Sequence, residues 1–509
     1  MQASLPARSP RPADELAPTG ILLRADSGTR LVAGGRALVG GSPARVLRLT
    51  PSGTRQIAGW FSGTAVSDGP AARTLARRLL DAGIAHPDFS ACGAAGTDVT
   101  VVIPVQDRHA ELARCLAGLA AANNDKKPRG LVAVPSELYT PRVIVVDDAS
   151  TDPSAISAIA AKYGAHVIHR PVNGGPAAAR NTGLAAATTD LVACLDSDCV
   201  PAPGWLDPLV PHFIDPAVGA VAPRIVPHEA GTTWLARYEG ASSTLDMGAC
   251  PSIVRPGARV SYVPGAALVV RRAAAGRGFA EALLVGEDVD FVWRLASAGW
   301  RVRYEPAATM GHDHRVRLRA WFSRRADYGT SAAALEELHP GAVRPLYASW
   351  WTVGAWAALL CRRPVTAAAL TATATALLAR RLSPVTGDRW PVPRFRETAG
   401  WGLAVRLAGG GTVAAGRPIG SALSRTWWPV AIPAAIAFPK LRAPVAALML
   451  APPLLDWAYR RPPLDPGRYV AARLLDDAAY GLGVWGGCMK RRTIRALLPA
   501  IGNRRPPNS

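Results

Sequence analysis

The sequence lacks the features of a secreted or disulfide-stabilised protein. It contains 7 cysteines, an odd number, and no C-x-x-C pair. These absences argue against a disulfide scaffold and against a zinc ribbon. The first ten residues, MQASLPARSP, also lack the apolar core of a signal peptide. We therefore expect a protein of the reducing cytosol.

Acidic residues and long apolar runs are scarce in the last third of the chain. Residues 340–509 hold 23 Arg and Lys against 6 Asp and Glu, a net charge of +17 out of +21 for the whole sequence. The apolar runs there are shorter than the roughly 20 residues of a spanning helix, and proline interrupts most of them. The basic charge favours an anionic membrane surface, at the inner face of the cell membrane, over nucleic acid. The short runs favour interfacial or re-entrant helices over true spans, with ordinary buried helices of a third domain as a further alternative.

Length and composition together predict several structural units. Because 509 residues exceed one ordinary domain, we expect a flexible arm over 1–20, a small module over 21–97, a large α/β domain over 98–339 and a helical membrane-associated tail over 340–509. Two strand-like pieces and two short helices indicate that the small module is winged-helix-like and able to hold an extended peptide. A structural cap on the next domain is the alternative.

The large domain alternates short apolar strands with helices. This alternation predicts a mostly parallel, Rossmann-like sheet with right-handed crossovers. The expected strands are, in chain order, 98–104, 141–147, 165–169 and 191–195, followed by 219–226, 260–271 and 301–304.

Two aspartates follow the strand at 191–195. Asp196 and Asp198 are separated by one serine at the carboxyl end of that strand, where open α/β sheets bind ligands. Two carboxylates placed there can share Mg²⁺ or Mn²⁺, which in turn holds phosphate oxygens. A solvated turn would also produce this motif, so its position in the fold decides the interpretation.

Other side chains at strand ends are candidates for binding a nucleotide. Asp147 and Asp148 end the second strand and could accept hydrogen bonds from a base or ribose, although one of them could instead cap a helix. The remaining candidates are expected under the base or beside the phosphates: Pro104, Gln106, Arg108, Gly174 and Arg180. For Arg180 a solvated position on its helix is the alternative.

A second acidic pair begins a later helix. Glu287 and Asp288 could simply complement the helix dipole, but transfer of a group to an acceptor hydroxyl needs one general base, which a carboxylate can supply. We assign Asp288 as that base, with Glu287 orienting. His312 and His314 follow a strand and could complete the metal ligands, because Mn²⁺ accepts imidazole; a structural role is the alternative.

Five motifs in this order resemble the inverting glycosyltransferases of family two, which have the GT-A fold. The motifs are VVIPVQDR, VIVVDDASTD, NGGPAAARNTGL, CLDSD and GEDVDFVWRL. The resemblance implies that Asp148 lies at the nucleoside pocket, that Asp196 and Asp198 form the metal motif, and that Asp288 is the base. The Gln-x-x-Arg-Trp motif of processive members is missing, so high processivity is not expected.

Further segments resemble the mycofactocin-biosynthesis branch of this family. They include LVGGSPARVLRLT, VRPGARVSYVPGAALVVRR and GHDHR. This resemblance implies a UDP-glucose donor, a peptide-derived redox-cofactor precursor (premycofactocin) as acceptor, and repeated transfer that builds a β-1,4-glucan. The alternatives are a family-two enzyme acting on a lipid or cell-wall acceptor at the membrane, a nucleotidyltransferase, and a non-catalytic membrane scaffold.

Overall fold

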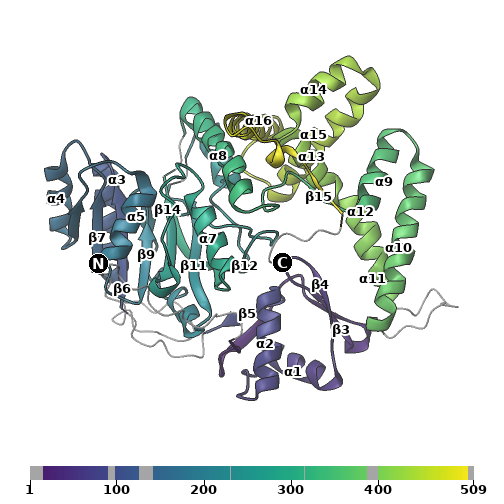
Figure 1. The fold of residues 1–509 in the computed structure, drawn as a ribbon, viewed down its shortest axis with the longest axis horizontal. Coiled ribbons are helices and arrows are strands. Elements are labelled where there is room, and N and C mark those ends of the chain that lie inside the picture. The colour runs from purple at the N-terminus through teal and green to yellow at the C-terminus, as the bar shows by residue number, and fades with distance from the viewer. Residues whose placement is uncertain are drawn as a thin grey trace.

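The computed structural model describes residues 15–89, 98–124, 142–229, 231–313, 316–386 and 399–502. A central sheet with its helices forms the middle of the molecule, and the N-terminal module lies below it (Figure 1). The C-terminal helices lie above and to the right of the sheet in the same view. The predicted long connection over 123–141 falls almost entirely outside the described residues.

The central sheet has nine strands in the order β10-β14-β11-β13-β9-β6-β7-β8, and β12 pairs with β14. Strands β6, β7, β8 and β9 run parallel to one another, whereas β13 runs antiparallel to both β9 and β11. The expected α/β sheet is therefore mixed rather than mostly parallel, because the strands after the Asp-x-Asp motif do not continue the strand–helix alternation. Their bounds are β6 (Val99–Val105), β7 (Arg142–Asp147), β8 (His166–His169), β9 (Leu191–Leu195), β10 (Cys199–Pro201), β11 (Val218–Pro227), β12 (Ser252–Val254), β13 (Ala267–Arg271) and β14 (Arg301–His312).

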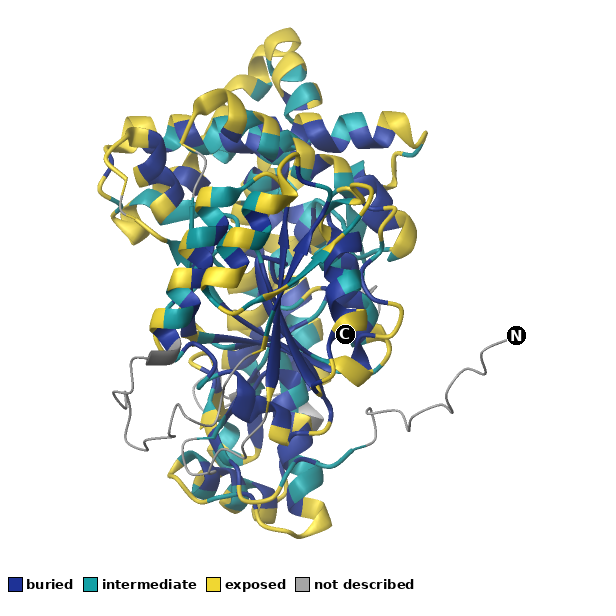
Figure 2. Cartoon of the chain, turned by 90° about the vertical axis from the view of Figure 1, so that its left-hand side faces the viewer, coloured by how far each residue is buried: buried dark blue, intermediate teal, exposed yellow. Residues whose placement is uncertain are grey.

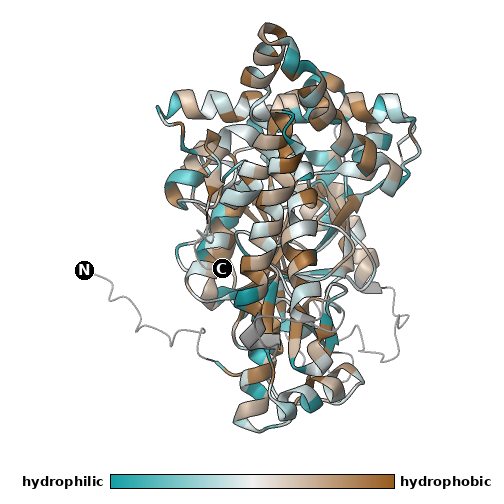
Figure 3. Ribbon diagram, turned by 90° about the vertical axis from the view of Figure 1, so that its right-hand side faces the viewer, coloured by the Kyte–Doolittle hydropathy of each residue, from teal (hydrophilic) through white to brown (hydrophobic). Residues whose placement is uncertain are grey.

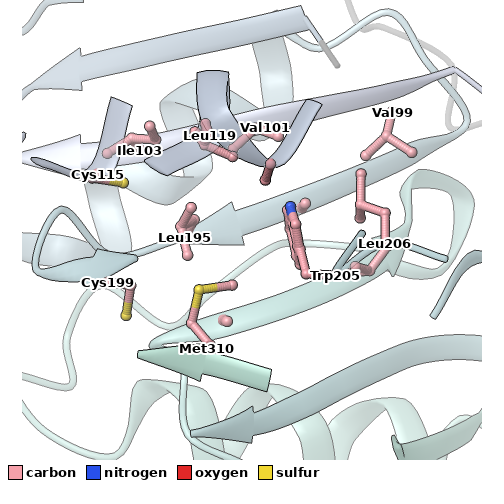
Figure 4. Packing of buried hydrophobic residues seen from close by; sticks show 14 of the residues in the cluster. Val99, Val101, Ile103, Cys115, Leu119, Leu195, Cys199, Trp205, Leu206 and Met310 are labelled. Atoms are coloured by element: carbon pink, nitrogen blue, oxygen red, sulfur yellow. The ribbon is translucent and has the colours of Figure 1, made fainter. Parts of the chain in front are cut away.

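Helices cover both faces of this sheet. On one face α3 (His109–Asn124) and α4 (Pro153–Lys162) share a buried cluster with the odd-numbered side chains of β6. Figure 4 shows this cluster, in which Trp205 and Met310 fill the space beside β9. On the other face α5 (Gly175–Ala186) and α7 (Glu287–Ser297) pack against Val102. Because side chains alternate along a buried strand, one strand serves two cores, and the sheet is the dark blue centre of Figure 2.

The N-terminal module has its own buried core and is held to the sheet domain by ion pairs. The core is formed between residues 17 and 85. Arg77 pairs with Asp215 at 2.7 Å, and Asp81 pairs with Arg301 at 2.9 Å. The module contains β1 (Leu22–Ala25), β2 (Arg30–Val32), β3 (Ala37–Gly40), β4 (Arg45–Arg48), α1 (Pro51–Phe61), α2 (Pro70–Ala82) and β5 (Ala85–Asp88). Strands β2, β3 and β4 form an antiparallel sheet and β1 pairs with β5; the winged-helix-like assignment stays a prediction.

The C-terminal part is almost entirely helical. Its elements are α8 (Leu318–Leu338), β15 (Tyr347–Ala348), α9 (Trp350–Leu360), α10 (Pro364–Thr386), α11 (Ala399–Ala404), α12 (Gly411–Ala414), α13 (Gly416–Arg425), α14 (Trp428–Ala437), α15 (Pro439–Arg460), α16 (Pro466–Lys490) and β16 (Ala500–Ile501). Among the described residues, none of these helices is both long enough and apolar enough to cross a membrane. Shorter helical pieces are η2 (Ala33–Gly35), η4 (Val210–Ile214), α6 (Trp234–Ser242), η5 (Arg272–Ala274), η6 (Val405–Gly410) and η7 (Arg495–Leu497).

Two local predictions are wrong. Residues 260–266 were expected in a strand, but β13 begins only at Ala267, because Pro264 has no N–H and the N–H of Gly265 is donated to Asp288. Prolines were expected to interrupt the apolar runs, yet α15 continues through Pro444, Pro452 and Pro453. The last two are buried, and packing against neighbouring helices overrides their low helix propensity.

Candidate active site

The carboxyl ends of β6, β7 and β9 border a cavity of about 580 Å³. Most of the residues predicted from the sequence line it. They are Pro104, Gln106, Arg108, Asp148, Arg180, Asp196, Asp198, Glu287, Asp288 and His312. Asp147 and Gly174 do not line this cavity, and His314 lies outside the described residues. Residues from six separate segments therefore converge on one space large enough for a small-molecule ligand.

Asp148 anchors the glycine turn that begins α5. Its Oδ1 accepts a hydrogen bond from the backbone N–H of Gly174, at 3.1 Å, and it also pairs with Arg170. Gly174 is the N-cap residue of α5, which has a proline in its first turn. The turn between β8 and α5 is thus held to the end of β7, and the positive end of the helix dipole lies at the cavity.

The carboxylate of Asp147 is buried and hydrogen-bonded to neighbouring protein groups. Its side chain is 1% exposed, and it accepts hydrogen bonds from the backbone N–H of Ser150 at 3.0 Å and from His169 Nδ1 at 2.8 Å. The other ring nitrogen of His169 lies 2.9 Å from the hydroxyl of Ser157. These residues line a separate cavity of about 460 Å³. The carboxylate of Asp147 therefore fixes the loop after β7, and it is absent from the cavity that holds Asp148.

Arg180 connects the two acidic pairs. Its guanidinium donates to Asp196 Oδ1 at 2.6 Å and to Glu287 Oε1 at 2.9 Å, and the residue is 2% exposed. Burial alone would lower the pKa of this guanidinium, but the charges of Asp196 and Glu287 raise it above its usual value. Arg180 is therefore a permanent cation inside the site, and the alternative of a solvated helix-face arginine is excluded by its burial.

Asp198 offers the clearest position for a divalent cation. Its Oδ1 is buried, and none of the described residues donates a hydrogen bond to it. His312 Nε2 lies 3.5 Å from this oxygen, and Arg108 pairs with the other carboxylate oxygen. One oxygen and one imidazole nitrogen fit the ligand preferences of Mn²⁺.

The neighbouring polar groups limit which residues can join that site. The ligand atoms of Asp198, Cys199 and His312 all lie within 4.8 Å of one another, but burial and the nearby aspartates raise the pKa of the Cys199 thiol well above its usual value. A neutral thiol is a poor ligand for a hard cation. Asp196 is not a member of this group, and its Oδ1 accepts a hydrogen bond from Arg180.

Glu287 and Asp288 form the first turn of α7. Gly286 precedes them with a φ of 85°, which a side-chain-bearing residue rarely adopts. Asp288 Oδ2 accepts the backbone N–H of Gly265 at 2.7 Å, so the carboxylate is held against the loop before β13. Burial, together with the charge of Asp288, raises the pKa of Glu287 above its usual value, while Arg180 opposes this shift.

Some lining residues could not have been found by reading motifs. Tyr262, Arg324 and Tyr328 line the cavity from the loop before β13 and from α8. Arg425 and Tyr480 reach it from α13 and α16. No spacing in the sequence connects these positions with the strand ends, and Arg425 and Tyr480 reach the cavity only through the packing of the C-terminal helices.

The arginine and tryptophan side chains at the start of α8 are held mainly by neighbouring helices. Trp321 donates its indole N–H to Glu239 at 2.8 Å, and Arg325 pairs with the same glutamate and with Asp476. All four side chains are buried. They tie α8 to α6 and α16. Arg324 and Arg325 both line the cavity, and the guanidinium carbon of Arg324 lies 4.8 Å from the ring centre of Tyr328.

Comparisons with known proteins identify the family. The model for glycosyl transferase family 2 matches residues 100–273, and the model for glycosyl transferase family group 2 matches residues 191–409. A pre-mycofactocin glycosyltransferase of Mycobacterium tuberculosis is 40% identical over 494 residues, which covers 95% of this chain and 98% of the relative. The chain belongs to glycosyl transferase family 2. It is a glycosyltransferase with a GT-A-like mixed α/β sheet.

More distant relatives match only part of this family 2 glycosyltransferase. The succinoglycan biosynthesis protein ExoU of Rhizobium meliloti is 30% identical over 227 residues, which covers 41% of this chain and 60% of that protein. A solved mannosyltransferase of Pyrobaculum calidifontis, in complex with GDP-Man and Mn²⁺, has 21% identity and a TM-score of 0.35. Its alignment covers 61% of this chain and 86% of the mannosyltransferase.

Proposed function

We propose that this enzyme transfers glucose from UDP-glucose to premycofactocin, a peptide-derived acceptor, with inversion at the sugar carbon. The acceptor assignment is supported by the pre-mycofactocin glycosyltransferase of Mycobacterium tuberculosis, which is 40% identical over nearly the whole chain. The donor assignment is supported by Asp148, Arg180 and Asp198, which line one cavity at the strand ends. Repeated transfer would build a short β-1,4-glucan.

The observation that carries the proposal is the position of Asp288. It lies in the same cavity as Asp196 and Asp198, and its carboxylate accepts the backbone N–H of Gly265 at 2.7 Å. In the proposed reaction the acceptor oxygen bonds to the sugar carbon while that carbon's bond to UDP breaks. Asp288 takes the hydroxyl proton, and UDP leaves with the electron pair.

The other charged residues stabilise the leaving diphosphate. Asp198 and His312 would hold Mg²⁺ or Mn²⁺, whose charge would stabilise the developing charge on the leaving group. Arg108 and Arg180 present further positive charge at the same end of the cavity. Glu287 positions Arg180 through the 2.9 Å hydrogen bond, so its role is positioning.

A membrane surface is proposed as a further partner. The α14–α15 tip, which comprises residues 436–442, exposes Ile436 by 67% and Phe438 by 62% and carries Lys440 and Arg442. Hydrophobic residues, coloured brown, occur along the outer helices in Figure 3, and α14 forms the top of the molecule in Figure 1. Apolar and basic residues together fit an anionic bilayer surface. Co-sedimentation with anionic vesicles should fall when Phe438 and Lys440 are both replaced by serine, and unchanged binding would contradict this part.

The experiment that tests the function offers several donors and acceptors to the purified enzyme. UDP-glucose, other UDP-sugars and GDP-mannose are each incubated with Mn²⁺ and with either premycofactocin or a lipid acceptor, and product masses are followed. We expect hexose additions to premycofactocin with UDP-glucose. Transfer only to the lipid acceptor would favour the alternative, a family 2 enzyme acting on membrane or cell-wall acceptors.

A further inference from the structure

The C-terminal helices complete one wall of the catalytic cavity. Arg425 at the end of α13 and Tyr480 of α16 line it together with Tyr262 and Tyr328. The guanidinium carbon of Arg425 lies 3.7 Å from the centre of the Tyr480 ring, which is close stacking for a cation on an aromatic face. The C-terminal part therefore supplies a cation and an aromatic ring to the active site.

Glycines of α16 allow this helix to approach α13 and α8 closely. A Cβ at Gly481 would lie 2.3 Å from the carbonyl oxygen of Arg425, and one at Gly483 would lie 1.9 Å from the carbonyl oxygen of Ala326 in α8. Both distances are far below normal contact, so only glycine permits this approach. The position of Arg425 beside the cavity thus follows from residues of α16 that do not line the cavity themselves.

The guanidinium of Arg425 has N–H donors that could bind a ligand. Its side chain makes no hydrogen bond with any residue of the described ranges, and its nearest carboxylate, that of Asp477, is 3.7 Å away. Burial alone would lower the pKa of the guanidinium, but Tyr480 and Asp477 raise it, so the group stays charged. Stacking occupies a face of a guanidinium and leaves its in-plane N–H donors able to bind a ligand oxygen.

The environment of Tyr262 places this cluster on the side of the base. Tyr262 lines the cavity three residues before Gly265, whose backbone N–H is donated to Asp288 Oδ2 at 2.7 Å, so the loop before β13 brings this cluster to the base. Burial and the charge of Asp288 raise the pKa of Tyr262 to about 12, while Arg425 opposes this shift. Asp196 and Asp198 follow β9, at the strand end where the donor phosphates are expected.

We propose that Arg425 binds the acceptor by donating hydrogen bonds to a carbonyl or carboxylate oxygen. A planar or aromatic part of the acceptor lies against the rings of Tyr262, Tyr328 and Tyr480. This assignment rests on the proposed function, since it needs Asp288 to take the acceptor's proton. It assigns acceptor selection to helices outside the part of the chain that holds the donor motifs.

The test compares Arg425→Met with Arg417→Met in the full-length enzyme. Arg417 lies on the same helix, but its side chain is 64% exposed and pairs with Asp456, so it is the matched control. UDP binding in Mn²⁺ is measured by calorimetry, and initial rates are measured against premycofactocin at saturating UDP-glucose. Loss of a charge-assisted hydrogen bond should raise the acceptor KM of Arg425→Met about 10-fold to 100-fold. UDP affinity and the control variant should be unchanged.

Three outcomes would overturn the assignment. An unchanged acceptor KM would remove Arg425 from acceptor binding, and an equal loss of UDP affinity would move it to the donor site. If Arg425→Met fails to fold, Arg425→Lys decides, because it keeps the cation but not the planar donor pair; we expect its KM to rise, and an unchanged value would contradict the proposal. Failure of the proposed function itself is distinct, since the wild-type enzyme would then glucosylate no premycofactocin.

Discussion

The packing of α8 on α16 makes a sharp prediction about two glycines of one helix. At Gly483 an added Cβ would lie 1.9 Å from the carbonyl oxygen of Ala326, whereas at Gly486 nothing lies within 4 Å. Both residues belong to α16. The change from glycine to alanine is therefore the same in chemistry and in secondary structure, and only the space beside the helix differs.

The sign of the effect should differ between these sites. At Gly483 the backbones must separate by at least about 1.1 Å to restore even a tight contact of 3.0 Å, and such overpacking costs about 1–3 kcal/mol. The higher helix propensity of alanine returns about 0.5–1 kcal/mol. We expect Gly483→Ala to lower the free energy of unfolding by about 1–2 kcal/mol, and Gly486→Ala to raise it by about 0.5–1 kcal/mol.

Urea unfolding followed by circular dichroism measures both changes. Because α16 carries Tyr480, Gly483→Ala should also raise the acceptor KM while UDP affinity stays the same. If the two alanine variants have equal stability, the close approach of α8 and α16 is wrong, and with it the position of the wall that holds Arg425.

Two further predictions concern the module interface and the metal site. Arg77 and Asp215 are both buried, so Asp215→Asn should lower the free energy of unfolding by about 3–5 kcal/mol. The control is Asp68→Asn, because the side chain of Asp68, which pairs with Arg73, is 89% exposed. This substitution should change the free energy of unfolding by less than about 0.5 kcal/mol. Burial would raise the pKa of Asp215, but Arg77 lowers it below its usual value. This pair therefore stabilises the fold above the ordinary carboxyl pKa near 4, and the stabilisation is lost as the pH falls below that value. An acid unfolding curve of the wild type identical to that of Asp215→Asn would contradict the account. Asp198→Ala should weaken UDP binding in Mn²⁺ by about tenfold or more and change little in EDTA, and equal Mn²⁺ dependence in both proteins would remove Asp198 from the metal site.

Local signals were enough to predict the strands and helices that bear the motifs. At the start of α4, for example, Asp152 accepts the N–H of Ala155 as the N-cap residue and a proline follows in the first turn, and both residue types favour a helix start. The continuous apolar run of β9 marked a strand buried on both faces, and all five of its residues are buried. The short strands β2 and β3 were missed because they contain few β-branched residues between glycines.

The acidic half of the site followed from motifs, and the basic, aromatic half did not. Asp148, Asp196, Asp198 and Asp288 stand at element ends that the sequence marks, so their convergence followed from sheet topology. Asp147 was expected beside them, but His169 and the Ser150 N–H take its oxygens, which depends on how β8 lies next to β7. Arg425 and Tyr480 depend on helix packing, which local patterns do not specify.

The most direct test of the account is turnover and UDP binding of Asp288→Asn, measured side by side with the wild type. Asparagine keeps the shape and can still accept the Gly265 N–H, but it cannot take a proton. We predict a loss of turnover of about 10²-fold to 10⁴-fold with UDP affinity within about twofold of wild type. Turnover equal to that of the wild type would show that the proton leaves by another route and that this cavity does not work as described.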